Sequence, residues 1–161
     1  MATIDEPLSA EDLTDARSLL REAPYAYVAS VEEQGPYVLP MNFAYAEDRA
    51  PRLAGTIYFH TGEGRKTAAW AADARVCVAV TGNVGFIQGD SPCRDGFAYR
   101  SLLVWGTIRP VEDTRDREAA LRTIVEKYDP AAAGMPFGAK DFAQTLIYAL
   151  DIEAASYKRE P

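Results

Sequence analysis

A basic pair follows a short glycine-containing turn near the middle of the chain. Thr56–His60 is β-branched and aromatic, which is typical of a strand, and Thr61–Gly64 contains two glycines, which predicts a tight turn. Arg65–Ala74 is rich in alanine and lacks glycine and proline, so it predicts a helix. A strand that feeds a helix in this way points free backbone N–H groups at one spot, where the helix dipole adds partial positive charge. With Arg65 and Lys66 beside that spot, the segment predicts a site for a phosphate-bearing ligand.

The same basic pair also has a purely structural interpretation. Charged residues at the start of a surface helix are often simply solvated, although cations are more stable at a helix C-terminus. Two nucleotide-binding motifs are excluded. A Walker loop requires glycine directly before its lysine, whereas Arg65 separates Gly64 from Lys66. A Rossmann fingerprint requires a third glycine further in, where Lys66 and Thr67 stand.

Length and composition bound the class of protein. With 161 residues, 48% hydrophobic and 25% charged, the chain predicts one soluble globular domain with its own core. The net charge of −7 argues against a broad surface for nucleic acid or an anionic membrane, and no apolar run reaches membrane-spanning length. Met1–Pro7 is polar and acidic, unlike a signal peptide. We therefore expect a cytoplasmic protein, with residues 1–8 as a flexible N-terminal tail.

The two cysteines offer little for metal binding. Cys77 lies in Arg75–Thr81, a predicted buried strand, and is interpreted as a small core residue. Cys93 lies beside Arg94 in the predicted long loop Gly82–Gly96, where it is either a reactive thiol or an ordinary loop cysteine. No Cys-x-x-Cys motif is present and the chain has one histidine, so no structural metal site is expected.

The rest of the pattern predicts a mostly antiparallel sheet with helices inserted singly. Ser9 is the predicted N-cap of a helix that Pro24 ends, and Thr114–Tyr128 and Ala139–Gln144 are further helical segments. Six strands, several joined as hairpins, favour a curved sheet or barrel. The six predicted strands are Tyr25–Val31, Pro36–Tyr45, Thr56–His60, Arg75–Thr81, Phe97–Pro110 and Thr145–Ile152.

Four residues within these elements are ambiguous. Pro40 lacks an N–H and suggests a bend or an edge, and Gly106 suggests a bulge or bend. Asn42 lies in an apolar run and must find hydrogen-bond partners, either in a neighbouring loop or on the polar ring edge of a ligand. Trp70 lies either in the core or at a subunit interface.

Taken together, these segments resemble the FMN-binding split-barrel family, in the branch related to pyridoxamine 5′-phosphate oxidase that contains the nitroimidazole-resistance proteins. The resemblance covers about Leu13–Tyr128 and depends on the order and spacing of the motifs. The segments that carry it are Ala29-Ser30-Val31, Gly35-Pro36-Tyr37-Val38-Leu39-Pro40-Met41-Asn42-Phe43, Ile57-Tyr58-Phe59-His60-Thr61 with Gly64-Arg65-Lys66, and Tyr99-Arg100-Ser101 with Gly106.

The resemblance implies a mainly β fold, a six-stranded antiparallel split β-barrel, that forms a homodimer with FMN at the dimer interface. It also implies a role for individual residues. These are Gly64, Arg65 and Lys66 at the phosphate, His60 and Thr61 along the phosphate and ribityl chain, Pro40, Met41, Asn42 and Phe43 beside the flavin ring, and Ser101 as a further cofactor contact.

The activity that the resemblance implies is reduction of a small electrophile, such as a nitroaromatic or a quinone, with NADH or NADPH as donor. Pyridoxamine phosphate oxidases carry an Arg/His substrate motif near the C-terminus, whereas Ser156–Pro161 has no histidine, which argues against vitamin B6 oxidation. The alternatives are a flavin carrier or sensor without turnover and a haem- or deazaflavin-binding protein. His60, the single histidine, is interpreted as a hydrogen-bonded strand-end residue, with catalysis or haem ligation as alternatives.

Overall fold

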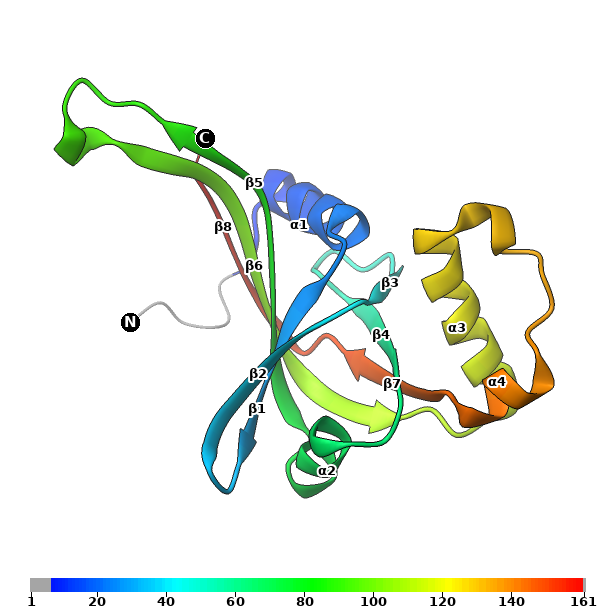
Figure 1. Cartoon of the computed structure of the whole chain (residues 1–161). Helices are drawn as coiled ribbons and strands as arrows, with labels where there is room; N and C mark the ends of the chain where they lie inside the picture. Colours follow the sequence, from blue (N-terminus) through cyan, green and yellow to red (C-terminus); the bar gives the residue numbers. More distant parts are fainter. Residues whose placement is uncertain (1–6, 161) are drawn as a thin grey trace.

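The structure, a computed structural model, describes residues 7–160 (Figure 1). Residues 1–6, which form most of the predicted N-terminal tail, lie outside the described residues, while Leu8 packs against the core. The helices are α1 (Ala10–Glu22), α2 (Arg65–Ala72), α3 (Thr114–Tyr128) and α4 (Ala139–Gln144). The strands are β1 (Ala26–Glu32), β2 (Gly35–Met41), β3 (Ala44–Glu47), β4 (Gly55–Thr61), β5 (Arg75–Ile87), β6 (Gly96–Pro110), β7 (Leu146–Asp151) and β8 (Ala154–Glu160).

The described residues form one antiparallel sheet of eight strands in the order β2-β1-β5-β6-β7-β4-β3, with β8 paired to β6. Strand β6 changes its neighbour along its length, because residues 99–105 pair with β8 and residues 108–110 pair with β7. Gly106 lies at this change, where an added Cβ would approach the Asp151 carbonyl oxygen to 2.3 Å. The absence of a side chain therefore permits the close crossing of β6 and β7 that curves the sheet.

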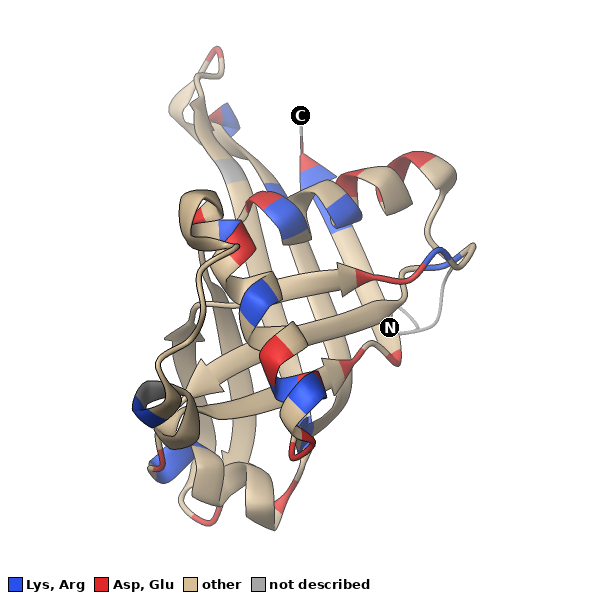
Figure 2. Cartoon of the chain, turned by 90° about the vertical axis from the view of Figure 1, so that its right-hand side faces the viewer, with Lys and Arg blue, Asp and Glu red and all other residues tan. Residues whose placement is uncertain are grey.

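The core lies on the inner face of the curved sheet. Leu19 and Leu20 of α1 pack there with alternate residues of the strands, such as Phe59. Trp70 is 3% exposed, its Nε1 donates to Ser30 Oγ at 3.0 Å, and its ring packs edge-on against Tyr148. Of the two predicted positions for Trp70, the structure shows the core. Charged residues lie mostly on helices and connecting segments, and the strands are largely uncharged (Figure 2).

The side chains of β2, β1, β5 and β6 that point away from the core form a second apolar surface, which we call the outer sheet face. Strand register aligns them in rows across the four strands. One row is Pro40–Tyr27–Ala79–Leu103, and the next is Val38–Ala29–Cys77–Trp105. Cys77 is therefore half-buried on the outer face, and the prediction that it is a core residue is wrong. Burial raises the pKa of its thiol.

The last two residues of α3 hydrogen-bond to α1 and to the segments that adjoin β1 and β3. The Tyr128 hydroxyl accepts from the Phe43 N–H at 3.0 Å and lies 2.7 Å from the Pro24 carbonyl oxygen. Lys127 Nζ donates to the Leu20 carbonyl at 3.1 Å and lies 3.5 Å from the centre of the Phe43 ring. A cation at the last carbonyls of α1 is favourable for that helix, although burial lowers the pKa of Lys127 to about 8.

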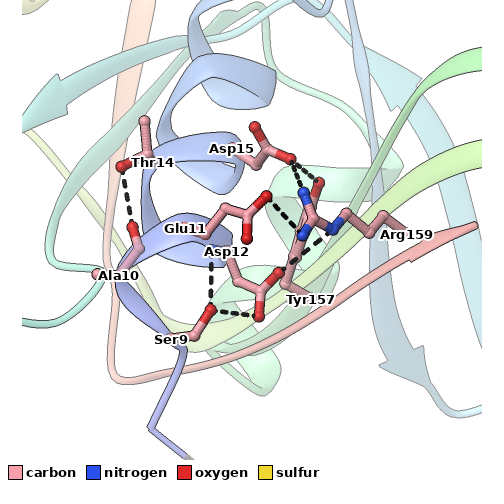
Figure 3. Close-up of polar contacts among 8 residues, drawn as sticks. All are labelled: Ser9, Ala10, Glu11, Asp12, Thr14, Asp15, Tyr157 and Arg159. Carbon is pink, nitrogen blue, oxygen red and sulfur yellow. Dashed lines mark hydrogen bonds and ion pairs between the residues drawn. The ribbon is translucent and has the colours of Figure 1, made fainter. Parts of the chain in front are cut away.

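Three predicted segments differ from the structure. The predicted loop Gly82–Gly96 is shorter than expected, because β5 continues to Ile87 and pairs with β6 from Gly96 onwards, with a bulge between Gly82 and Gly85. The predicted strand Pro36–Tyr45 divides into β2 and β3 after Met41. The chain also continues past Ile152 into β8, whose Arg159 pairs with carboxylates of α1 (Figure 3). Eight strands are thus described where six were predicted.

Candidate functional site

The turn between β4 and α2 has the predicted form. Gly64 precedes the first turn of α2 and has no side chain with which to cap the N–H groups there, which lack partners within any helix. Thr67 Oγ1 accepts from the Gly64 N–H at 3.0 Å and donates to the Gly64 carbonyl at 2.8 Å, which fixes the turn. The first turn of α2 contains no acidic residue. The helix ends at Ala72, two residues earlier than predicted.

Arg65 does not extend freely into solvent. Its guanidinium binds the carboxylate of Glu32, with Nε at 2.9 Å and Nη2 at 2.7 Å from Oε2. The guanidinium carbon also lies 4.7 Å from the centre of the Tyr37 ring. Glu32 raises the pKa of Arg65 through hydrogen bonding and charge, so the arginine stays protonated. A phosphate at α2 would therefore compete with Glu32 for Arg65.

Lys66, His60 and Thr61 surround the same turn with different orientations. Lys66 is half-buried and makes no ion pair within residues 7–160. His60 and Thr61 are consecutive strand residues, so their side chains point to opposite faces of β4. His60 is exposed opposite Ile147, whereas Thr61 donates its hydroxyl to the Gly62 carbonyl at 3.0 Å. At most one of these two side chains faces a ligand held at the start of α2.

The predicted ring-side residues lie at another part of the surface. Pro40, Met41 and Asn42 line a cavity of about 410 Å³ together with Tyr25 and Tyr27. The exposed Asn42 donates from Nδ2 to the Pro24 carbonyl at 3.2 Å, which is the loop contact that we considered for it.

Phe43 does not share this cavity. Its side chain is fully buried, and its backbone N–H and carbonyl both contact the Tyr128 hydroxyl. Since neither group of Phe43 is available, this residue supports the fold rather than a ligand contact.

Ser101 lies on the outer sheet face, half-buried and opposite Thr81. It is one row beyond Leu103, whose row ends at Pro40. Ser101 and the Pro40 cavity therefore belong to the same end of the same face, although they are far apart in the sequence.

The two sets of predicted residues are at opposite ends of the β1–β2 hairpin. Arg65 contacts Glu32 at the hairpin turn, whereas Tyr27 and Pro40 pair near the other end. Glu32 is five positions after Tyr27 along β1, which is roughly 17 Å of extended strand. One chain alone does not bring its phosphate-side residues together with its ring-side residues.

Several residues at these two places were missed by the sequence analysis. A groove of about 510 Å³ between the β1–β2 turn and α2 is lined by Glu32, Arg65 and three alanines of α2, among others. Glu32 directly follows the predicted strand Tyr25–Val31, and its charge at that strand end was the available signal. Tyr25 and Tyr27, which pack edge to face at 5.6 Å, were visible as paired aromatics before a proline-bearing strand.

Within residues 7–160 no group of three or more His, Cys, Asp or Glu side chains is arranged to hold a metal ion. None of the described helices is long and apolar enough to cross a membrane.

Comparison with known proteins identifies relatives of this fold. Residues 12–159 match the family model described as pyridoxamine 5′-phosphate oxidase. A FAD and haem binding protein from Mycobacterium smegmatis is 28% identical, with a TM-score of 0.78 over 94% of this chain and 71% of that one. A structure described as a 5-nitroimidazole antibiotic resistance protein from Bacteroides thetaiotaomicron is 22% identical, with a TM-score of 0.74 over 94% of this chain and 86% of that one.

A FAD-binding protein from Mesorhizobium loti is 20% identical, with a TM-score of 0.65 over 97% of this chain and 98% of that one. The two likenesses below 25% identity show only a shared fold, which is mainly antiparallel β and of the split-barrel type. No curated protein was found to match the sequence. Because the family model spans most of the sequence, the chain belongs to the pyridoxamine 5′-phosphate oxidase family.

Proposed function

We propose that this protein is a homodimeric flavoprotein that binds FMN and reduces a small electrophile with a nicotinamide donor. The observation that carries the proposal is the start of α2, where uncapped N–H groups, Arg65 and Lys66 meet without an acidic residue in the first turn. Such a helix end favours a phosphate, and two cations beside it strengthen that preference. Relatives of the same fold are described as binding FAD, which supports a flavin as the ligand.

The ring side of the site would use the cavity at Tyr25, Tyr27, Pro40, Met41 and Asn42. Its lining offers aromatic and apolar surface with one exposed amide, which fits a flat heteroaromatic ring with polar edges. Since this cavity lies at the far end of the β1–β2 hairpin from Arg65, we propose that one copy supplies the phosphate side and a second copy supplies the ring side. The uncovered apolar outer sheet face is the surface through which two copies would associate.

In this function the bound flavin supplies the hydride chemistry, and the chain supplies binding and orientation. Arg65, Lys66 and the first N–H groups of α2 would hold the phosphate. The cavity residues would orient the ring and exclude water from one side of it. No described side chain needs to move a proton for this role, and His60 stays a structural residue in the proposal.

Family membership does not make vitamin B6 oxidation the activity. Strand β8 ends Ser156-Tyr157-Lys158-Arg159-Glu160, and the chain has no histidine after His60. This segment therefore does not carry the Arg/His substrate motif of the pyridoxamine phosphate oxidases. Small nitroaromatics or quinones fit the proposal better, and a location in the cytoplasm stays a prediction.

The phosphate site is tested by changing its two cations together. In Arg65→Ala/Lys66→Ala, FMN affinity should fall on the order of 100-fold or more, because two charge-assisted contacts are lost. Riboflavin lacks the phosphate, so its affinity should change little. Quenching of flavin fluorescence measures both. Arg75→Ala is the matched control, since Arg75 is exposed near the other end of α2 and pairs with Asp73. Unchanged FMN affinity in the double variant contradicts the proposal.

Turnover is tested separately from binding. Anaerobic mixing of the FMN-loaded protein with NADH or NADPH should bleach the flavin absorbance on a catalytic timescale. An inert spectrum favours the alternative of a flavin carrier or sensor. The same spectrum detects haem through a Soret band, which matters because one relative is described as binding FAD and haem. His60 is the single imidazole that the chain could offer as an axial ligand.

A further inference from the structure

The groove between the β1–β2 turn and α2 has one charged wall and one apolar wall. Its volume of about 510 Å³ lies within the range of roughly 300–1,000 Å³ that small-molecule sites occupy. The residues that line it, from the turn and from α2, are Glu32, Glu33, Gln34, Arg65, Ala68, Ala69 and Ala72. The proposed FMN site uses only Arg65 of this set, so the rest of the groove is open to another ligand.

The wall formed by α2 is a flat apolar floor. Its residues recur at a spacing of three and four, so they share one face of the helix. After Arg65 this face carries only methyl groups, of which those of Ala68 and Ala72 are exposed and that of Ala69 is buried. Because no longer side chain covers these methyl groups, the floor can pack against one face of a flat ring such as a purine.

The wall formed by the turn carries hydrogen-bond acceptors beside this floor. Glu33 and Gln34 are both exposed, and Glu33 makes no ion pair among the described residues. A carboxylate accepts hydrogen bonds from the hydroxyls of a ribose, which is how an acidic residue holds the 2′-hydroxyl of NAD in dinucleotide-binding folds. A 2′-phosphate at the same place is anionic and would be repelled by Glu33. The turn therefore favours a ribose with a free 2′-hydroxyl.

Arg65 adds a cation at the N-terminal end of the floor, where α2 begins. Its side chain is 60% exposed although it pairs with Glu32. A guanidinium beside uncapped helix N–H groups favours a phosphate. Ala72 is seven residues further on, which is roughly 10 Å along the helix. The groove therefore offers, in order, a site for phosphate, acceptors for a ribose and an apolar surface for a base.

We propose that this groove binds the adenosine half of the nicotinamide donor and makes the protein prefer NADH to NADPH. The inference rests on the proposed function, in which such a donor reduces the bound flavin, and it adds the place where the donor is held. The base lies on the floor at Ala68, the ribose 2′-hydroxyl donates to Glu33, and the pyrophosphate lies at Arg65. Lys66 and the first N–H groups of α2 remain for the flavin phosphate.

NAD⁺ is the probe for the groove, because it has the same adenosine half but donates no hydride. In titration calorimetry with the FMN-loaded protein, Ala68→Phe should weaken NAD⁺ binding at least about tenfold, because a phenyl ring fills the floor. Ala71→Phe is the matched control on another, exposed face of α2 and should leave the affinity within about twofold. Circular dichroism checks that both variants fold. Equal NAD⁺ affinities in wild type and Ala68→Phe overturn the proposal.

The preference between donors is tested at Glu33. The wild-type protein should bind NAD⁺ at least about tenfold more tightly than NADP⁺, and Glu33→Arg should reduce that ratio to about threefold or less by attracting the 2′-phosphate. Glu126→Arg makes the same change of charge at an exposed residue of α3 and should leave the ratio unchanged. A wild-type protein that binds NADP⁺ as tightly as NAD⁺ overturns the proposed preference.

Flavin titrations separate failure of the groove from failure of the proposed function. A protein that binds FMN, but whose NAD⁺ affinity is the same in wild type and Ala68→Phe, overturns the role of the groove alone. A protein that binds no FMN overturns the proposed function and the donor role together. FAD carries the same adenosine group. If FAD binds more tightly than FMN and loses this advantage in Ala68→Phe, the groove holds FAD and its assignment to the donor is wrong.

Discussion

Helices α1 and α2 both begin after a turn at the surface, yet their first turns carry opposite charges. In α1 the Ser9 hydroxyl accepts from the Asp12 N–H at 3.1 Å, and Glu11 and Asp12 complement the helix dipole. Arg159 of β8 then lies 2.8 Å from Glu11 and 3.2 Å from Asp15 (Figure 3). In α2 the cap is a glycine, and the first two residues are Arg65 and Lys66.

The difference indicates at which helix N-terminus the charges and N–H groups find their partners within the chain. At α1 every charge has a partner of opposite sign, and the cap satisfies an N–H that would otherwise need water. At α2 the dipole and two cations have the same sign, so the arrangement is unfavourable unless an anion joins it. Glu32 supplies one carboxylate to Arg65, but from the neighbouring hairpin and not from the helix itself. The contrast supports a ligand role for α2 and a stabilising role for α1.

The strongest test makes α2 resemble α1. In Gly64→Asp a carboxylate caps the first turn and faces the position proposed for the phosphate. Gly64 tolerates a side chain, because its φ of 162° is extended and an added Cβ meets nothing within 4 Å. FMN affinity should fall about 10- to 100-fold from like-charge repulsion, while riboflavin affinity and folding are preserved. Isothermal titration with both flavins measures this.

Gly64→Ser is the matched control for that change. It provides the same kind of cap without the charge, so its effect on FMN should be several times smaller. Equal losses in the two variants would indicate that the N–H groups of α2, and not its charge, hold the phosphate. No loss in either variant would remove α2 from the binding site.

A smaller effect is expected from releasing Arg65. The Glu32 side chain is 13% exposed and holds the guanidinium through short bonds to both of its carboxylate oxygens. Glu32→Gln removes the competing charge, so FMN should bind about 3- to 10-fold more tightly, with riboflavin unchanged. Glu33→Gln removes the same formal charge from an exposed neighbour and should leave the affinity within about twofold. Weaker FMN binding in Glu32→Gln would show that Glu32 orders Arg65 for the ligand instead.

The sequence predicted correctly those elements whose signals lie within one short segment. Ser9 before an acidic first turn predicted the start of α1, and the glycines before an alanine-rich run predicted the turn ahead of Arg65; the structure confirms both. The partnership of Arg65 with Glu32 joins residues 33 apart, and it depends on how a hairpin lies over a helix. No periodicity within either segment contains that information.

Pairing between segments far apart in the sequence also explains the larger differences between the predicted and the observed strands. Ala154–Glu160 is polar and charged at its end, so no strand was predicted there, and it becomes β8 only because β6 offers an unpaired edge. The glycines around Val84 suggested a loop, but the ladder with β6 and the Phe86–Phe97 contact make it strand. In the same way, Ser101 and Pro40 share one face only through the register of four strands.

The smallest effect is expected at α1, where Arg159 closes a network that needs no ligand. Each exposed ion pair contributes little by itself, but the carboxylates of α1 share Arg159 as their one cation. Arg159→Ala removes these pairs together and should lower the melting temperature by about 1–3 °C at low salt. The loss should fade in about 1 M NaCl, where such charges are screened. Arg109→Ala, which removes one exposed pair with Asp151, should cost less. FMN affinity should stay within about twofold of wild type. If Arg159→Ala weakened FMN as strongly as Gly64→Asp does, the division between a self-contained α1 and a ligand-dependent α2 would be wrong.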